Sequence, residues 1–331
     1  MGDSLGHAAV IFLISASACV VIGRMAIPVL LHAQRVAPAR YEDCPPLTDY
    51  QQLKQGTPTM GGLFVLFVGI LVAGTAGGLA HREGWLVLGA VAGLGAVGLL
   101  DDCLKFRGEN GRGLRGAPKL VIALTIGALL GLATVPSPVS ARAIEIPWLQ
   151  RTVEVGWGWV PFAMVVVAGS AHAVNLTDGM DGLASGCVAI ALSALGCWAL
   201  TSDRPHPTLV VWCASLAGAC IGFLWFNSFP ASIFLGDVGA LGLGAALGTI
   251  SLLTRTALWL PVIGGVFVVE TLSVIFQVAS YKWRGQRRIF RVAPLHHHFH
   301  LGGTSEPKLI VRFWIVGLLL AMLGLTMVRL P

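Results

Sequence analysis

Charged residues are scarce in this chain. Asp, Glu, Lys and Arg make up 11% of its 331 residues, whereas an ordinary globular domain is about 25% charged. Hydrophobic residues make up 55%, and the mean hydropathy is +0.78. The length alone would suggest roughly two soluble domains, but so little charge excludes that reading and indicates a protein that crosses a membrane several times.

Other signals are missing as well. The seven cysteines show no CxxC and no Cys–His ligand spacing, which argues against a disulfide framework and a zinc site. "GTPTMGG" (56–62) is not followed by the Lys-Ser/Thr of a phosphate-binding P-loop. No low-complexity tail or separate soluble domain interrupts the chain, so one transmembrane domain over 1–331 is expected. The N-terminal apolar run lacks the basic start of a signal peptide and is long enough to be the first span.

Apolar segments long enough to cross a bilayer occur ten times, since a span needs about 20 such residues. They are 8–31, 60–80, 84–100, 118–136, 158–174, 183–201, 207–226, 234–254, 257–280 and 309–329. The sequence therefore predicts an all-α fold: a polytopic integral membrane protein with about ten transmembrane helices.

The basic residues are unevenly divided between the two faces that ten spans create. The face opposite the termini carries more than half of the chain's 22 Lys and Arg. The positive-inside rule makes that face cytoplasmic and the termini external. Nearly every unusual polar stretch falls on the same basic face, which is the pattern of one composite site.

Three aspartates on that face are candidates for metal binding. Asp101 and Asp102 end one span, and Asp237 lies between glycines at the start of another. Mg²⁺ prefers hard oxygen ligands and usually takes one or two carboxylates together with substrate phosphates. The alternatives are a solvated helix end, with Lys105 and Arg107 as counter-charges, and a helix-capping role for Asp237.

Two more aspartates occur in "NLTDGMDG" (175–182). Capping would place Asp178 at the N-cap of the following helix and Asp181 in its first turn. Capping does not explain why Asn175 and Thr177 crowd the same loop. That mixture of amide, hydroxyl and carboxylate also suits a ligand, so both interpretations stay open.

Basic and imidazole groups would complete such a site. "HHHFH" (296–300) follows "RGQRRIFR" (284–291), and together they favour an anion such as a diphosphate over zinc. This loop is expected outside the bilayer, so replacing its histidines should affect activity more than folding. Lys54 precedes "GTPTMGG" and could neutralise a phosphate, although Pro58 also fits an ordinary helix start. The combination points to phosphoryl transfer involving a lipid.

The motifs carry a resemblance to a known family. "GTPTMGG", "DDCLK", "NLTDGMDGLA", "FLWFNSFPASIFLGDVGALGLG" and "PLHHHF…EPKLIVRFW" resemble the polyprenyl-phosphate N-acetylhexosamine-1-phosphate transferases, in their phospho-N-acetylmuramoyl-pentapeptide branch. The resemblance implies a Mg²⁺-dependent enzyme of the bacterial cytoplasmic membrane. Its substrates would be UDP-MurNAc-pentapeptide and undecaprenyl phosphate, and its products lipid I and UMP. Membrane lipid is a further expected partner, nucleic acid is not, and a homodimer is left open.

The same resemblance assigns roles to individual residues. Asp101, Asp102 and Asp237 match catalytic positions, and Asp237 matches the metal ligand. The substrate-binding positions are Lys54, Thr59, Lys119, Asn175, Asp178, Asp181, Asn227, Phe234, His296, His297 and His298.

Four residues depart from the family pattern, namely Gln51, Ala117, Ala240 and His300. They predict differences from the family in the details of substrate binding. One rival interpretation is the same chemistry with UDP-GlcNAc. A second is a cation transporter, which should place acids near the middle of its spans, whereas Glu270 is the only acid there. One-step and two-step mechanisms both remain open.

Overall fold

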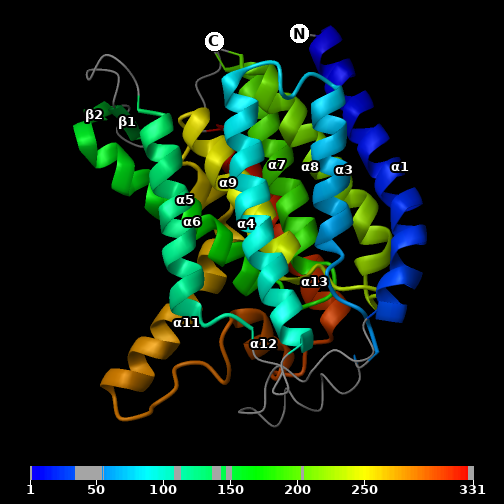
Figure 1. Cartoon of the computed structure of the whole chain (residues 1–331). Coiled ribbons are helices and arrows are strands. Elements are labelled where there is room, and N and C mark those ends of the chain that lie inside the picture. The colour runs from blue at the N-terminus through cyan, green and yellow to red at the C-terminus, as the bar shows by residue number, and fades with distance from the viewer. Residues whose placement is uncertain are drawn as a thin grey trace.

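The structure, a computed structural model, describes residues 2–33, 54, 56–107, 113–135, 143–146, 151–202 and 205–326. Helices dominate these ranges (Figure 1). The long helices are α1 (Gly2–Ala33), α3 (Gly62–Thr75), α4 (Arg82–Arg107), α5 (Gly116–Ala133), α6 (Trp159–Thr177), α7 (Leu183–Thr201), α8 (Pro207–Asn227), α9 (Gly236–Leu253), α11 (Gly265–Trp283) and α13 (Glu306–Thr326). The short elements are η3 (Gly156–Gly158), α10 (Leu260–Ile263), α12 (Leu295–His300) and the strands β1 (Ala143–Ile146) and β2 (Arg151–Glu154).

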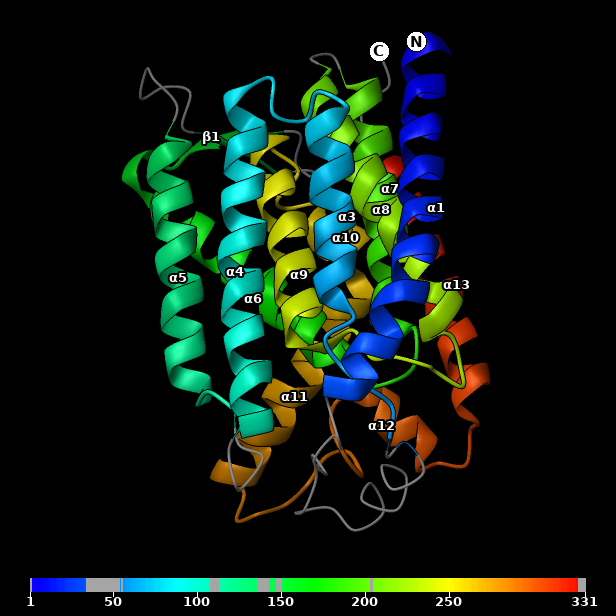
Figure 2. The ribbon, with the colours of Figure 1, turned by 45° about the vertical axis from the view of Figure 1, so that its right-hand side comes forward.

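Each predicted span has a helix. Within the described ranges, nine helices are long and apolar enough to cross a membrane, and α3 is a shorter apolar helix of 14 residues. The all-α, polytopic prediction is therefore confirmed. At 1.5 Å per residue α3 is only about 21 Å long, less than the roughly 30 Å hydrocarbon core. Its first turn accordingly lies well above the lower end of α4 (Figure 2).

Helix α9 forms the centre of the bundle. In its membrane-crossing window 94% of the residues are buried, and α4, α6 and α3 pack around it. Small residues allow this close approach, as is usual between membrane helices. A Cβ atom on Gly244 would meet the backbone of Ala171, and one on Gly98 would meet the backbone of Asp237. These glycines bring the lower ends of α4, α6 and α9 together.

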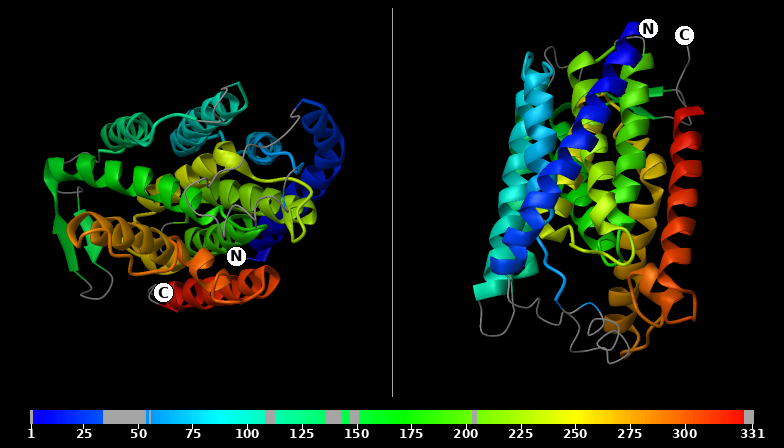
Figure 3. Two further views of the ribbon diagram at one scale, coloured as in Figure 1. Left: turned by 90° about the horizontal axis from the view of Figure 1, so that it is seen from below. Right: turned by 90° about the vertical axis from the view of Figure 1, so that its right-hand side faces the viewer.

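The two ends of the bundle differ. The first turn of α1 and the last turn of α13 lie at the same end, whereas α12 and the lower ends of α4 and α11 lie at the other (Figures 1 and 3). Residues 58–62 join this lower end through backbone hydrogen bonds: Phe234 N–H donates to Pro58 O, and Gly61 N–H donates to Phe234 O. The polar segments that the sequence placed on one face therefore do share one end.

Three features differ from the sequence-based prediction. The predicted span 257–280 is divided, because α10 stops at Gly264 before α11 begins, and α11 then leans outward at the lower end (Figure 1). Strands β1 and β2 form an antiparallel hairpin that was not predicted. Helix α4 continues to Arg107 instead of ending at residue 100, so Asp101 and Asp102 lie inside a helix.

Candidate active site

A carboxylate cluster lies where α4 meets the first turn of α9. Asp101, Asp102 and Asp237 are buried, and one oxygen from each lies within 4.8 Å of the others. The alternative of a solvated helix end does not hold for the first two, because both are fully buried. Three hard oxygen donors that meet at one point suit a divalent cation, so this cluster could hold a metal ion.

Two lysines balance the negative charge of the cluster. Lys105 Nζ lies 2.5 Å from Asp101 Oδ2 and 3.1 Å from Asp237 Oδ2. Lys119, which α5 supplies, lies 3.0 Å from Asp101 Oδ1 and 2.8 Å from Asp237 Oδ2. Buried carboxylates need such partners because removing them from water is costly. The sequence predicted Lys119 as a site residue, but treated Lys105 only as a counter-charge.

Backbone and amide groups fix the orientation of the three carboxylates. Leu114 N–H donates to Asp101 Oδ1 at 2.6 Å, and Val238 N–H donates to Asp102 Oδ2 at 3.2 Å. Asn175 Nδ2 donates to Asp237 Oδ1 at 3.1 Å. The site therefore draws on α4, α5, α6 and α9, and Asn175, predicted as a substrate-binding residue, contacts the carboxylate cluster.

Thr59 reaches the same cluster through a glycine with an unusual backbone. Gly236 has φ +76, a region that other residues rarely adopt. A Cβ atom there would lie 2.7 Å from Asp102 Oδ2 and 2.8 Å from Thr59 Oγ1. The absence of a side chain at 236 thus lets buried Thr59 lie beside the carboxylates.

A second charged cluster joins three distant parts of the chain. Lys54 Nζ lies 2.5 Å from Asp181 Oδ1 and 2.7 Å from Glu306 Oε1. Asp181 N–H donates to Glu306 Oε1 at 3.0 Å, and Ala231 N–H donates to Asp181 Oδ2 at 3.0 Å. The ring of Phe234 lies 5.9 Å from Lys54 Nζ, a distance typical of a cation–π contact. Burial raises the pKa of Asp181, and Lys54 partly opposes that rise.

The aspartates of the 178–181 loop do not cap α7. Its N-cap is Gly182, which has φ +74 and makes no side-chain capping bond. Asp178 is instead the C-cap of α6, and its N–H donates to Val174 O and Asn175 O. The interpretation that Asp178 and Asp181 cap α7 was therefore wrong. Asp181 instead forms an ion pair with Lys54.

Two of the predicted histidines are buried against the same loop. His296 and His297 lie on α12 with ring centroids 4.2 Å apart. A Cβ atom on Gly179 would collide with His296 Nε2 and lie 3.2 Å from His297 Nε2. Burial, followed by the neighbouring His296, lowers the pKa of His297 to about 2. The expectation that replacing these histidines would hardly affect folding was wrong for His296 and His297, because both are buried and their replacement should also disturb the fold.

His298 and Asn227 form hydrogen bonds with neighbouring segments of the chain. His298 Nδ1 accepts a hydrogen bond from Arg291 N–H at 3.1 Å. Asn227 is buried, accepts from Ser185 Oγ at 2.9 Å and donates to Ile233 O at 2.8 Å. In this structure both side chains hold neighbouring segments in place.

Comparison with known proteins gives consistent results over most of the chain. Residues 84–255 match Glycosyl transferase family 4, and residues 54–66 match Phospho-N-acetylmuramoyl-pentapeptide-transferase signature 1. The Phospho-N-acetylmuramoyl-pentapeptide-transferase of Citrifermentans bemidjiense is 43% identical over 290 residues, which cover 83% of this chain and 81% of the relative. That of Thermodesulfovibrio yellowstonii is 41% identical over 293 residues, covering 84% and 81%.

The chain belongs to the phospho-N-acetylmuramoyl-pentapeptide-transferase family. The family resemblance predicted from the motifs is confirmed, and the protein is a transferase and an integral membrane protein of bacterial type. The signature includes Lys54 and Thr59, and the longer match spans the residues from Asp101 to Asp237. Both charged clusters therefore draw on regions shared with this family.

Two buried acids beside the site, Glu306 and Glu270, were not predicted as site residues from the sequence. Glu306 nevertheless completes the cluster around Lys54. Its Oε2 is buried and has no hydrogen-bond partner among the described residues. Glu270 was noted as a mid-span acid, and it contacts His296. Acids at membrane depth usually mark function, so the position of Glu270 within a predicted span was a signal that could have found it. No local pattern indicated the contact of Glu306 with Lys54.

The four departures from the family pattern lie in different surroundings. Ala240 is buried within α9, Ala117 is exposed in the first turn of α5, and His300 is half-buried at the end of α12. Gln51 lies outside the described residues. None of the first three replaces a member of the two charged clusters.

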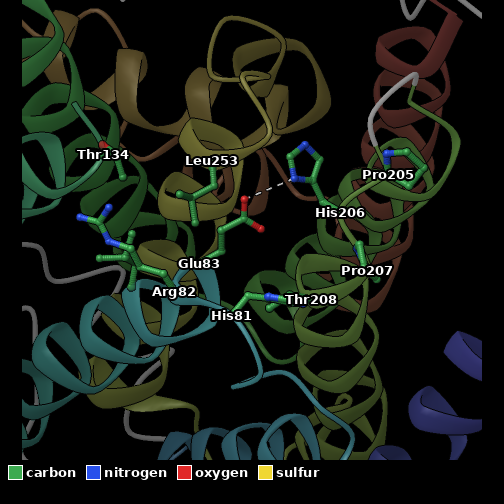
Figure 4. Close-up of a pocket in the computed structure, with 10 residues that line it drawn as sticks. His81, Arg82, Glu83, Thr134, Pro205, His206, Pro207, Thr208 and Leu253 are labelled. Atoms are coloured by element: carbon green, nitrogen blue, oxygen red, sulfur yellow. Dashed lines mark ion pairs between the residues drawn. The ribbon is translucent and has the colours of Figure 1, made fainter. Parts of the chain in front are cut away.

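A cavity of about 560 Å³ opens at the other end of the bundle (Figure 4). Arg82 and Glu83 line it, together with His81 and His206. Asp102 is 19 positions after Glu83 along α4, which corresponds to about 28 Å. The cavity is therefore remote from both charged clusters.

Proposed function

We propose that this protein transfers phospho-MurNAc-pentapeptide from UDP-MurNAc-pentapeptide to undecaprenyl phosphate, which yields lipid I and UMP. The observation that carries the proposal is the buried carboxylate–lysine cluster at one end of a membrane bundle, in a chain 43% identical over 290 residues to a phospho-N-acetylmuramoyl-pentapeptide-transferase. A phosphate acceptor held in the bilayer and a water-soluble donor would meet at that end.

We further propose that Asp101, Asp102 and Asp237 hold Mg²⁺. When bound, the ion supplies charge compensation for the diphosphate oxygens. Lys105 and Lys119 place two more positive charges beside the same point. Positioning and charge neutralisation account for most of the catalysis of phosphoryl transfer, so these five residues are the proposed catalytic machinery.

In the bond changes we propose, an oxygen of the lipid phosphate attacks the phosphorus that carries the sugar. The bond from that phosphorus to the UMP oxygen breaks, and its electron pair leaves with UMP. Asp101 lies within the cluster and is held by Leu114 N–H, so it is placed to orient the acceptor or remove a proton from it. A two-step route through an aspartyl phosphate uses the same residues.

The second cluster and the histidines would bind the nucleotide sugar. Lys54 offers positive charge, Phe234 an aromatic face, and Asp181 a hydrogen-bond acceptor. We place this end on the cytoplasmic side of the bacterial inner membrane and the termini outside, because the loops at this end are rich in Lys and Arg. We also propose that 1–331 works as a single transmembrane domain, with a homodimer as a further option.

The test is a reaction with purified protein. UDP-MurNAc-pentapeptide, undecaprenyl phosphate and Mg²⁺ should give UMP and a lipid-linked product in equal amounts. EDTA should stop the reaction, and added Mg²⁺ should restore it. Protein that binds both substrates but releases no UMP would overturn the proposal.

A further inference from the structure

Glu270 and His296 form a buried pair, in which the proposed reaction gives Glu270 no role. Glu270 lies on α11 and His296 on α12, and neither side chain is exposed. His296 Nδ1 lies 3.1 Å from Glu270 Oε2. The backbone N–H of His296 points at the same carboxylate, 3.2 Å from Oε1 and 3.4 Å from Oε2.

This geometry determines which ring nitrogen carries a proton. A backbone N–H can only donate, so both carboxylate oxygens of Glu270 act as acceptors. With Glu270 as a carboxylate, which can only accept, Nδ1 is the donor in its contact with Oε2. A carboxylate that accepts from one ring nitrogen fixes the orientation of the ring and leaves the other nitrogen for function.

The other nitrogen, Nε2, faces the loop that contains Asp181. It is buried and has no hydrogen-bond partner within the described chain. It packs against Gly179, where a Cβ atom would collide with it. A buried polar atom without a partner is costly, and the position beside the 178–181 loop is where a nucleotide sugar would supply that partner.

We infer that Glu270 is a positioning residue, which holds His296 with Nδ1 protonated so that Nε2 contacts the nucleotide sugar. The identity of this ligand rests on the proposed function. The protonation of Nδ1 does not, so the two can fail separately.

Nitrogen NMR on protein labelled with [¹⁵N]histidine tests the protonation directly. A difference spectrum against His296→Asn assigns the two ring nitrogens. The wild type should show a protonated Nδ1, and Glu270→Gln should shift that signal or give a mixture of tautomers. An unprotonated Nδ1 in the wild type overturns the inference, whether or not Glu270→Gln folds and whether or not the protein turns over its substrate.

A double-mutant cycle tests the positioning role. Glu270→Gln should lower kcat/KM for UDP-MurNAc-pentapeptide by about 10–100-fold, by analogy with groups that orient metal-bound histidines. In a His296→Asn background the same change should have almost no further effect. A residue that only stabilises the fold would reduce activity by the same factor in both backgrounds, and that result contradicts the inference.

Glu83→Gln is the matched control. Glu83 also faces a histidine from a helix, with Oε1 3.5 Å from His206 Nδ1, but at the far end of the bundle (Figure 4). Its replacement should leave kcat/KM unchanged. If it lowers kcat/KM as much as Glu270→Gln does, the effect at Glu270 is not specific and the inference fails.

Discussion

The two ends of α4 both carry charge, but in different surroundings. At the lower end, Asp101 and Asp102 are fully buried and share two lysines with Asp237. At the upper end, Glu83 lines an open cavity and its contact with His206 is 3.5 Å long, with side chains 38% and 23% exposed.

The difference shows what marks a site in this protein. An exposed ion pair contributes about 0–1 kcal/mol, whereas removing one partner of a buried pair costs about 3–5 kcal/mol. A chain with so little charge concentrates its buried acids at one end, where four helices contribute to one cluster. In this protein, buried acids and ion pairs between distant segments therefore mark the site, whereas a cavity alone does not.

Asp237→Asn should have the largest effect and tests the lower end directly. The change keeps the size of the side chain but removes one of three carboxylates, so Mg²⁺ should bind more weakly and turnover should fall by orders of magnitude. Initial rates as a function of Mg²⁺ concentration measure this. Normal turnover at limiting Mg²⁺ would show that Asp237 is not a ligand.

Phe234→Ala tests whether the lower end also binds the nucleotide. Loss of an aromatic face under a base costs about 1–3 kcal/mol, so KM for the UDP-sugar should rise accordingly. The ring also lies 5.9 Å from Lys54 Nζ, which adds to the effect. An unchanged KM, with a defect only in use of the lipid, would remove Phe234 from the nucleotide pocket.

Glu306→Gln and Glu83→Gln compare the two ends with one chemical change. Glu306 is buried and binds Lys54 and Asp181 N–H, so its replacement should cost about 1–3 kcal/mol of stability. Glu83 is partly exposed, so its replacement should cost less than about 1 kcal/mol. Thermal unfolding of both variants measures the difference. Equal losses would mean that burial does not distinguish the two ends.

His297→Asn tests burial at the lower end through pH. The folded protein holds the pKa of His297 at about 2, against an ordinary value of 6.5. The unfolded chain therefore binds a proton first as pH falls below 6.5, and stability is lost on acidification. Between pH 7 and pH 5 the variant should lose about 1–2 kcal/mol less stability than the wild type. The same loss in both proteins would contradict the burial of a neutral imidazole.

The sequence predicted the spans well because about 20 apolar residues in a row have few other uses. It missed the break between α10 and α11, since residues on both sides of Gly264 are apolar. It also missed the β1–β2 hairpin, whose two strands have only four residues each.

The site was only partly predictable, because some of its contacts join residues that are far apart in the sequence. Asp101, Asp102 and Asp237 stand out as acids in apolar surroundings. The partners of Lys54, by contrast, are Asp181 and Glu306, 127 and 252 residues away, and no local pattern reports such contacts. The burial of His296 was missed because the basic residues that precede it suggest an exposed loop.

The most direct test of the account is a side-by-side assay of two donors. We propose that the lower end is the site of a phosphotransferase that selects a sugar bearing a peptide with carboxylates. The segment 281–308 supports this choice, since Glu306 is its single acid among many Lys, Arg and His. With undecaprenyl phosphate and Mg²⁺, UDP-MurNAc-pentapeptide should give UMP and a lipid-linked product, and UDP-GlcNAc should give neither. Equal or faster transfer from UDP-GlcNAc would contradict the account.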